Sequence, residues 1–199
     1  MKKTLIALAF VTAGLATVPA FAQSYPSNNS GNGGWFVGAK VGDATLNKGA
    51  YNGSDTGYAI DGGYRWSVAP NVALGLETGY NDLGTIKLRN AFSSNPVLAH
   101  PKSQLHGWTF GGTGHFNITR NWYVSARAGI YQWQGHGLSN NSNPLYRNIS
   151  KTDFYGGAGF GYDFSNNFSV GLNYDYYGAK KDNLNLSTNL YSVSAEYRF

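Results

Sequence analysis

The chain has 199 residues, enough for one domain, and its formal charge of +5 is too small and too scattered to indicate a nucleic-acid partner. It contains no cysteine, which excludes disulfides, thiol nucleophiles and zinc–thiolate sites. Aromatic residues make up 16% of the chain and charged residues only 13%, about half the usual charged share.

The N-terminus carries the features of a secretory signal peptide. Lys2 and Lys3 precede an apolar run over 5–18, and Pro19-Ala-Phe-Ala22 then supplies a small-residue cleavage site. We predict a signal peptide over 1–22, against the alternative of an N-terminal anchor helix, and a flexible polar segment over 23–34. No later stretch suits a membrane helix, so a closed β-barrel is the remaining way for this chain to span a membrane.

From Trp35 onward, apolar residues recur at every second position, as in strands with one apolar face. In the first segment Trp35, Val37 and Val41 alternate with small residues and Lys40. The same alternation occurs in eight segments, which cover 35–46, 56–66, 71–83, 105–118, 121–134, 152–164, 167–177 and 188–199. We therefore predict one all-β domain over 35–199, an eight-stranded antiparallel up-and-down transmembrane β-barrel.

The connections between these segments alternate in length. Long polar connections are expected at 47–55, 84–104, 135–151 and 178–187, and tight turns at 67–70, 119–120 and 165–166. Outer-membrane barrels have short periplasmic turns and long outer loops, so we expect both termini in the periplasm of a bacterium. Aromatic residues gather at both ends of the apolar face, which favours a membrane barrel over a soluble sandwich or lipocalin.

Ten ionisable residues fall at inward positions: Lys40, Asp61, Arg65, Glu77, His115, Arg127, Asp163, Asp175, Glu196 and Arg198. We expect Lys40, Asp61, Glu77, Arg127 and Glu196 to form a charge network in the lumen, because unpaired charges there are costly. Lys40 is predicted to pair with Glu196, and Glu77 with Arg127 or Lys40. The network suits a structural core or, as the alternative, the gate of a small porin-like channel for ions or small solutes.

Several short motifs resemble the N-terminal transmembrane domain of outer membrane protein A. They are Trp35-Phe-Val-Gly-Ala-Lys-Val-Gly42, Gly62-Gly-Tyr64, Gly75-Leu-Glu-Thr-Gly-Tyr-Asn-Asp-Leu-Gly84, Arg127-Ala-Gly129 and Tyr197-Arg-Phe199. Each motif is short, but their order and spacing together resemble that family from about residue 35 to the end. The resemblance implies an eight-stranded barrel with a polar lumen filled by side chains.

The resemblance also implies an assembly signal: Tyr191, Tyr197 and Phe199 are similar to the residues that the outer-membrane insertion machinery reads. Family members often carry a peptidoglycan-binding domain after the barrel, and the chain stops at Phe199, so we expect no such domain. Glu77 matches the acid of the family's interior gate. The positions of the gate's bases are Thr113 and Gly171 here, so the resemblance does not carry that gate over.

No catalytic, cofactor or metal site is expected. His115 is followed two residues later by Asn117 rather than serine, and the other histidines lie in or beside the long connections. We expect a structural or surface role in the outer membrane, in contact with membrane lipid. Lipopolysaccharide is a further expected partner, through basic residues of the long connections, which are Lys87, Arg89, Lys102, Lys180 and Lys181.

Overall fold

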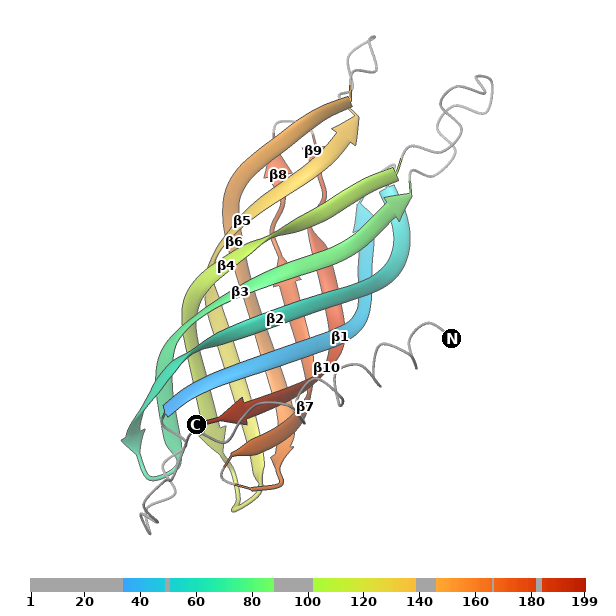
Figure 1. Cartoon of the computed structure of the whole chain (residues 1–199). Coiled ribbons are helices and arrows are strands. Elements are labelled where there is room, and N and C mark those ends of the chain that lie inside the picture. Colours follow the sequence, from blue (N-terminus) through green and yellow to red (C-terminus); the bar gives the residue numbers. More distant parts are fainter. Residues whose placement is uncertain (1–33, 49–50, 88–101, 139–145, 166, 182–183) are drawn as a thin grey trace.

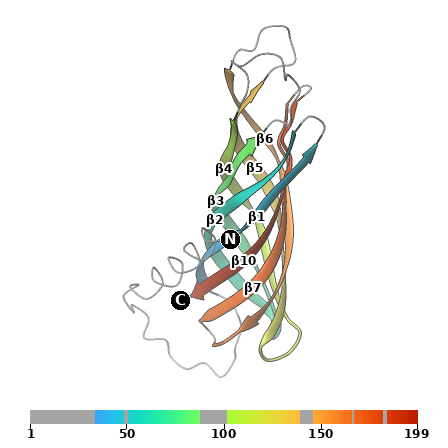
Figure 2. The same cartoon turned by 90° about the vertical axis from the view of Figure 1, so that its right-hand side faces the viewer.

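The computed structural model describes residues 34–48, 51–87, 102–138, 146–165, 167–181 and 184–199. Eight strands close into one antiparallel barrel in the order β1-β10-β7-β6-β5-β4-β3-β2 (Figures 1 and 2). The predicted eight-stranded architecture is confirmed. The expected signal peptide (1–22) and all but the last residue of the expected flexible segment (23–34) lie outside the described residues, and Gly34 begins β1.

The barrel strands are β1 (Gly34–Lys48), β2 (Tyr51–Ala69), β3 (Val72–Lys87), β4 (Lys102–Asn117), β5 (Trp122–Leu138), β6 (Tyr146–Asp163), β7 (Phe168–Tyr177) and β10 (Thr188–Arg198). Two short strands, β8 (Lys180–Lys181) and β9 (Leu184–Asn185), pair with each other between β7 and β10. Among the described residues, no helix is long and apolar enough to cross a membrane.

The three tight connections and the C-terminus lie at one end of the barrel, which we call the turn end (Figure 1). Backbone hydrogen bonds close two of the turns, from Ile118 to Trp122 at 2.8 Å and from Phe164 to Phe168 at 2.9 Å. The Phe199 amide donates to the Trp35 carbonyl oxygen at 2.9 Å. The last residue therefore joins the first strand, so that neither terminal strand is left as an open edge.

At the opposite end, which we call the outer end, two predicted loops are replaced by strands. The expected loop 47–55 is wrong, because β1 and β2 stay paired as far as Lys48 and Tyr51. β5 and β6 stay paired as far as Leu138 and Tyr146. Polar Asn, Gly and Ser residues do not end a strand when its backbone groups pair across a hairpin, so polarity of the sequence alone does not mark a loop.

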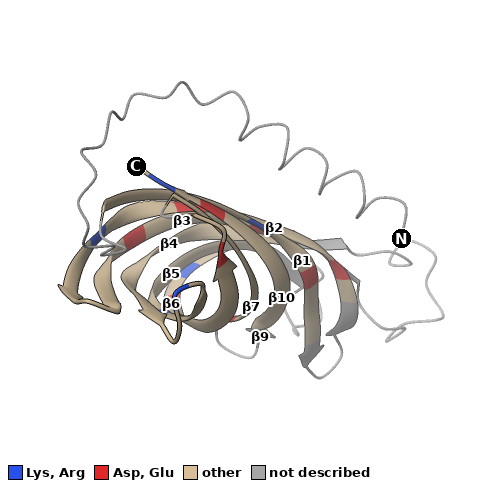
Figure 3. Cartoon of the chain, turned by 90° about the horizontal axis from the view of Figure 1, so that it is seen from below, with Lys and Arg blue, Asp and Glu red and all other residues tan. Residues whose placement is uncertain are grey.

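The side chains alternate between the lumen and the outer surface along every barrel strand. Residues with large apolar side chains lie exposed on the outer surface, among them Trp35, Trp66, Trp122 and Phe164 toward the turn end and Tyr58, Trp108, Phe154 and Tyr191 toward the outer end. Seen from the turn end, charged positions are sparse along the strands (Figure 3). This surface has the apolar band and the two aromatic girdles that lipid contact favours.

Candidate functional site

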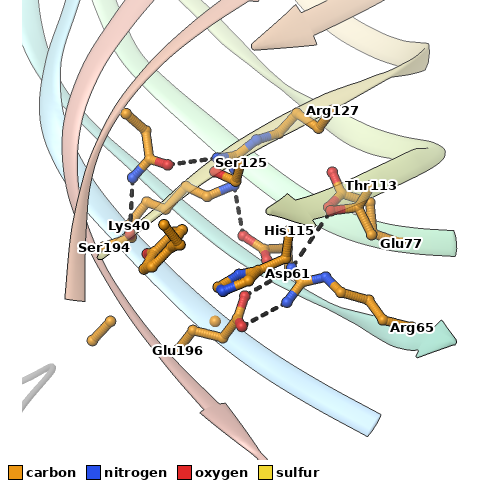
Figure 4. Close-up of a pocket in the computed structure, with 14 residues that line it drawn as sticks. Lys40, Asp61, Arg65, Glu77, Thr113, His115, Ser125, Arg127, Ser194 and Glu196 are labelled. Carbon is orange, nitrogen blue, oxygen red and sulfur yellow. Dashed lines mark hydrogen bonds and ion pairs between the residues drawn. The ribbon is translucent and has the colours of Figure 1, made fainter. Parts of the chain in front are cut away.

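The middle of the lumen holds two ion pairs, buried or nearly so, on the adjacent strands β10, β1 and β2. Lys40 Nζ lies 2.8 Å from Asp61 Oδ1, and the two terminal nitrogens of Arg65 bind the two carboxylate oxygens of Glu196 at 2.6 and 2.8 Å (Figure 4). The flat fork of a guanidinium matches a carboxylate in this bidentate way, which makes the second pair the stronger one. The Arg65 guanidinium also stacks on the Phe36 ring, 3.8 Å from its centre.

The predicted pairing of Lys40 with Glu196 is wrong. Asp61 on β2 and Glu196 on β10 both lie opposite Gly38, so the two carboxylates flank β1 at the same level. Lys40 therefore has an acid on each side, and strand register alone does not choose between them. Arg65 occupies Glu196, and Lys40 pairs with the remaining acid.

The predicted cation partner of Glu77 is also wrong. Glu77 Oε1 accepts a hydrogen bond of 3.0 Å from the Tyr155 hydroxyl, and no cation lies within ion-pair distance of it among the described residues. Arg127 turns instead toward β7, where it bonds Asn173 Oδ1 at 2.5 Å and lies 3.3 Å from Asp175 Oδ1. The Tyr155 hydroxyl on β6, and not a cation, is therefore the partner of the Glu77 carboxylate.

At the turn end of the lumen, Asp163 gathers four polar side chains. It accepts hydrogen bonds from Ser169 at 2.5 Å, Asn117 at 2.9 Å and Arg198 at 2.8 Å, and the His115 ring lies 3.2 Å away. The Ser169 hydroxyl donates to the carboxylate and not to the imidazole. This arrangement is a structural polar cluster, since an activated serine must face its histidine base.

The outer end of the lumen is apolar, which departs from the expected polar interior. Fully or almost fully buried residues form one cluster there: Ala44, Leu46, Leu83, Leu105, Tyr131, Trp133, Tyr155, Tyr177, Ala179, Leu186 and Leu190. We call this set the apolar plug. Every barrel strand except β2 contributes to it, and Gly57 of β2 lies directly against Leu190 and Ala44.

The cavity described in the lumen is small and lies among the ion pairs, and no residue of the apolar plug lines it. A cavity of about 20 Å³ lies among Lys40, Asp61, Arg65, Glu77 and Arg127, and it also meets Thr113, one of the two positions compared with the family's gate. That volume holds roughly one or two water molecules. The lumen is thus filled by side chains, as expected for a barrel of eight strands.

The structure places all five residues of the expected charge network around this cavity (Figure 4). It adds Arg65, Tyr155, Asn173 and Asp175 as partners that the expected network did not contain. All four stand at inward positions of their strands, so the period-two alternation could have identified them. A network drawn from charged residues alone omits Tyr155 and Asn173, whose neutral groups satisfy charged neighbours.

The three residues of the expected assembly signal lie on the outer surface of β10 and at its end. Tyr191 is 56% exposed and Phe199 46% exposed, and the Tyr197 and Phe199 rings pack edge to face at 5.1 Å. The histidines show no shared site within the described residues: His115 is buried in the lumen, and His106 is half-buried on the outer surface. Within the described part of the chain, no three His, Cys, Asp or Glu residues could hold a metal ion together.

Comparison with known proteins agrees with this architecture. Outer membrane protein P5 of Haemophilus influenzae is 31% identical over 140 residues, which cover 65% of this chain and 36% of that protein. Outer membrane protein A of Klebsiella aerogenes is 36% identical over 113 residues, which cover 49% of this chain and 29% of that protein. The chain therefore spans about a third of the length of these relatives.

Solved structures show the same fold at low sequence identity. The N-terminal β-barrel domain of Pseudomonas aeruginosa OprF is 17% identical and covers 84% of this chain and 99% of its own, with a TM-score of 0.50. The outer membrane enzyme PagL is 18% identical and covers 82% and 99%, also with a TM-score of 0.50. The family model of the outer membrane protein β-barrel domain matches residues 8–199, so the chain belongs to this family of Gram-negative outer-membrane β-barrels.

Proposed function

We propose that this protein is a structural and surface component of the outer membrane whose lumen is sealed in its resting state. The observation that carries this proposal is the combination of the apolar plug with the ion pairs beneath it, which leaves room for roughly one or two waters. An ion crossing such a plug would lose its hydration and gain few polar partners, at a large cost in free energy.

Conductance measurements on the refolded protein in planar bilayers test the sealed lumen. We expect no steady current through the unmodified barrel, because the buried residues of the apolar plug separate the ion pairs from the outer end. The alternative function, a small gated channel, predicts a steady or flickering current that changes when Glu77→Ala or Arg127→Ala is introduced. A current of that kind would overturn the sealed lumen.

We further propose that the protein is not an enzyme. Its match to P5 and to outer membrane protein A supports this, and the likeness to PagL extends to the fold alone. Ser169 and His115 share Asp163, and the hydroxyl donates to this carboxylate instead of to an imidazole base. Release of fatty acid from lipid A, or cleavage of peptides, by the folded barrel would contradict the proposal.

The proposed orientation puts the turn end in the periplasm and the outer end outside the cell. The short turns and the long hairpins support it, because this asymmetry is typical of outer-membrane barrels. Gly34 and Phe199 would then both lie at the periplasmic side. Membrane lipid would contact the exposed apolar band, and Tyr191, Tyr197 and Phe199 would face the insertion machinery during assembly.

Lipopolysaccharide is proposed as the partner of the outer end. Lys180 is exposed there and supports the proposal, while the side chains of Lys87, Lys102 and Lys181 and all of Arg89 lie outside the described residues. Ammonium groups at this level can bind lipid phosphates. Lys180→Glu should weaken binding of the purified barrel to lipopolysaccharide vesicles. If the variant and the parent bind equally well, Lys180 has no part in this contact.

A further inference from the structure

The connection between β7 and β10 carries a short paired hairpin, and the residues that flank it are buried. Between β7 and β10 the structure describes residues 178–181 and 184–187, which we call the mouth segment. Its short strands β8 and β9 lie beside the tall β5–β6 hairpin (Figure 1). Ala179 and Leu186 are both fully buried and belong to the apolar plug, so the mouth segment supplies the outermost layer of that plug.

Two hydrogen bonds join the mouth segment to the barrel wall at β6. The Gly178 amide donates to the Phe154 carbonyl oxygen at 2.9 Å, and the Lys180 amide donates to Asp153 Oδ2 at 2.7 Å. Within the segment, the Leu186 amide donates to the Ala179 carbonyl oxygen and the Ala179 amide donates to the Ser187 hydroxyl. The two halves of the segment are therefore tied to each other as well as to the wall.

The two described hydrogen bonds between the mouth segment and β6 lie outside the strand ladders of the barrel, so their loss would leave those ladders intact. The internal bonds of the segment persist if it swings away, at the loss of the two bonds to β6 and the apolar contacts of Ala179 and Leu186. β8 and β9 are two residues each, and a hairpin of that size has little stability apart from its packing. Closure of the segment therefore rests on the burial of Ala179 and Leu186, and not on the hairpin itself.

The boundary between apolar and polar lumen lies directly beneath this segment. On β10 the inward positions read Leu190, Ser192 and Ser194: the first belongs to the plug, and the last lines the cavity among the ion pairs. Ser192 is 6% exposed, and its hydroxyl has no hydrogen-bond partner within the part of the chain that is described. Loss of the outermost apolar layer would let water reach this hydroxyl.

We propose that the mouth segment is a lid, held shut by Leu186 and Ala179, whose opening connects the polar lumen with the outside of the cell. This inference rests on the proposed sealed resting state and adds the element that would unseal it. The lid opens by release of apolar contacts, and the ion pairs around Lys40 and Glu196 stay in place. Opening therefore depends on the packing of the plug and not on exchange of charged partners.

Thiol labelling below the plug tests the lid. The chain has no cysteine, so Ser192→Cys introduces a single, nearly isosteric thiol at a position whose hydroxyl makes no bond to the described residues that would be lost. N-ethylmaleimide is added to the folded barrel in detergent, and labelling is followed by mass spectrometry. Adding Leu186→Asn should accelerate labelling by about tenfold or more, because burying an amide in the plug disfavours closure.

The matched control is Lys180→Ala in the same Ser192→Cys background. Lys180 belongs to the mouth segment, but its exposed side chain lies outside the plug, so labelling should stay within about twofold of the parent. Equal rates with and without Leu186→Asn overturn the lid. Equal acceleration by both variants also overturns it, because the effect would then not depend on the plug.

Hydrogen exchange on the unmodified protein tests the lid without any variant, in case Leu186→Asn does not fold. The amides of Gly178 and Lys180, whose bonds to β6 break when the lid opens, should exchange together, well before the Leu190 and Ser192 amides of β10. Exchange of all four at one rate would overturn the lid. A steady conductance of the unmodified barrel would instead overturn the sealed lumen of the proposed function, so the two failures are distinguishable.

Discussion

At the scale of single residues, the arrangement of the lumen depends on which side chain pairs with each charged residue. Asp61 and Glu196 both flank Gly38, and the geometry of Arg65 decides which of them is left for Lys40. Glu77 is satisfied by a phenol and Arg127 by an amide together with a carboxylate. The lumen is thus a mixed network in which neutral groups also pair with charges.

Breaking the strongest of these pairs should destabilise the barrel. Arg65→Ala leaves the Glu196 carboxylate in the lumen with Arg198, at 3.8 Å, as the nearby cation, and should lower the free energy of unfolding by about 3–5 kcal/mol. Urea titration of the barrel in lipid vesicles, followed by tryptophan fluorescence, measures the loss. Lys151→Ala, at an exposed position, should change it by less than about 0.5 kcal/mol.

A second variant distinguishes loss of the ion pair itself from the cost of leaving the Glu196 carboxylate unpaired in the lumen. Arg65→Met combined with Glu196→Met removes both charges and should recover most of the lost stability, because apolar replacement of a buried pair is often neutral. If the double variant is as unstable as Arg65→Ala, the pair itself, and not the unpaired carboxylate, accounts for the loss.

At the scale of elements, neighbouring strands meet closely where inward positions hold glycine. A Cβ added to Gly75 of β3 would overlap the Tyr64 carbonyl oxygen of β2, so only glycine fits at this crossing. Gly112 of β4 points outward, and a Cβ added there would have the Gly75 carbonyl oxygen as its nearest neighbour, at 3.9 Å. Glycines that share a sheet can therefore have opposite tolerance to substitution.

Alanine at these two positions should shift stability in opposite directions. Gly75→Ala must move the β2 and β3 backbones apart and should lower the free energy of unfolding by about 1–3 kcal/mol. Gly112→Ala fits in open space and should raise it by about 0.4–1 kcal/mol, because the unfolded chain loses freedom. Parallel urea titrations compare them, and equal effects would show that crowding at Gly75 is relieved elsewhere.

Period-two alternation predicts some features of these strands and not others. It assigns a face to each residue, which is enough to place Lys40, Glu77 and Arg127 inside the barrel. It does not contain the order of contacts across strands, so it does not identify the partners of Lys40 and Glu77. It also does not mark where pairing stops, and Leu46 and Leu105 stand at the ends of predicted segments, where the pattern gives no sign of a plug.

At the scale of the whole molecule, the outer surface should behave according to depth in the bilayer. Leu172 is 64% exposed midway along β7, and Gln134 is exposed on β5 beyond Trp108 and the outer girdle. Leu172→Arg should cost about 2–4 kcal/mol and Gln134→Arg about 0–1 kcal/mol, because arginine is penalised most at the bilayer midplane. Unfolding measured in vesicles gives both numbers, and equal costs would contradict a membrane band centred on Leu172.

The proposed orientation, which rests on short turns at one end of the barrel and long hairpins at the other, can be tested in living cells. Arg120 is exposed in the turn 118–121, and Lys151 is exposed near the outer end of β6. In a chain without cysteine, Arg120→Cys and Lys151→Cys each create one thiol, at opposite ends of the barrel. A maleimide attached to a polymer too large for porins should label only the second in intact cells, and both after the outer membrane is disrupted. Both thiols lie at exposed positions, so a difference between them reports the side of the membrane and not local burial. Labelling of Arg120→Cys alone would place the turn end, and with it Phe199, outside the cell.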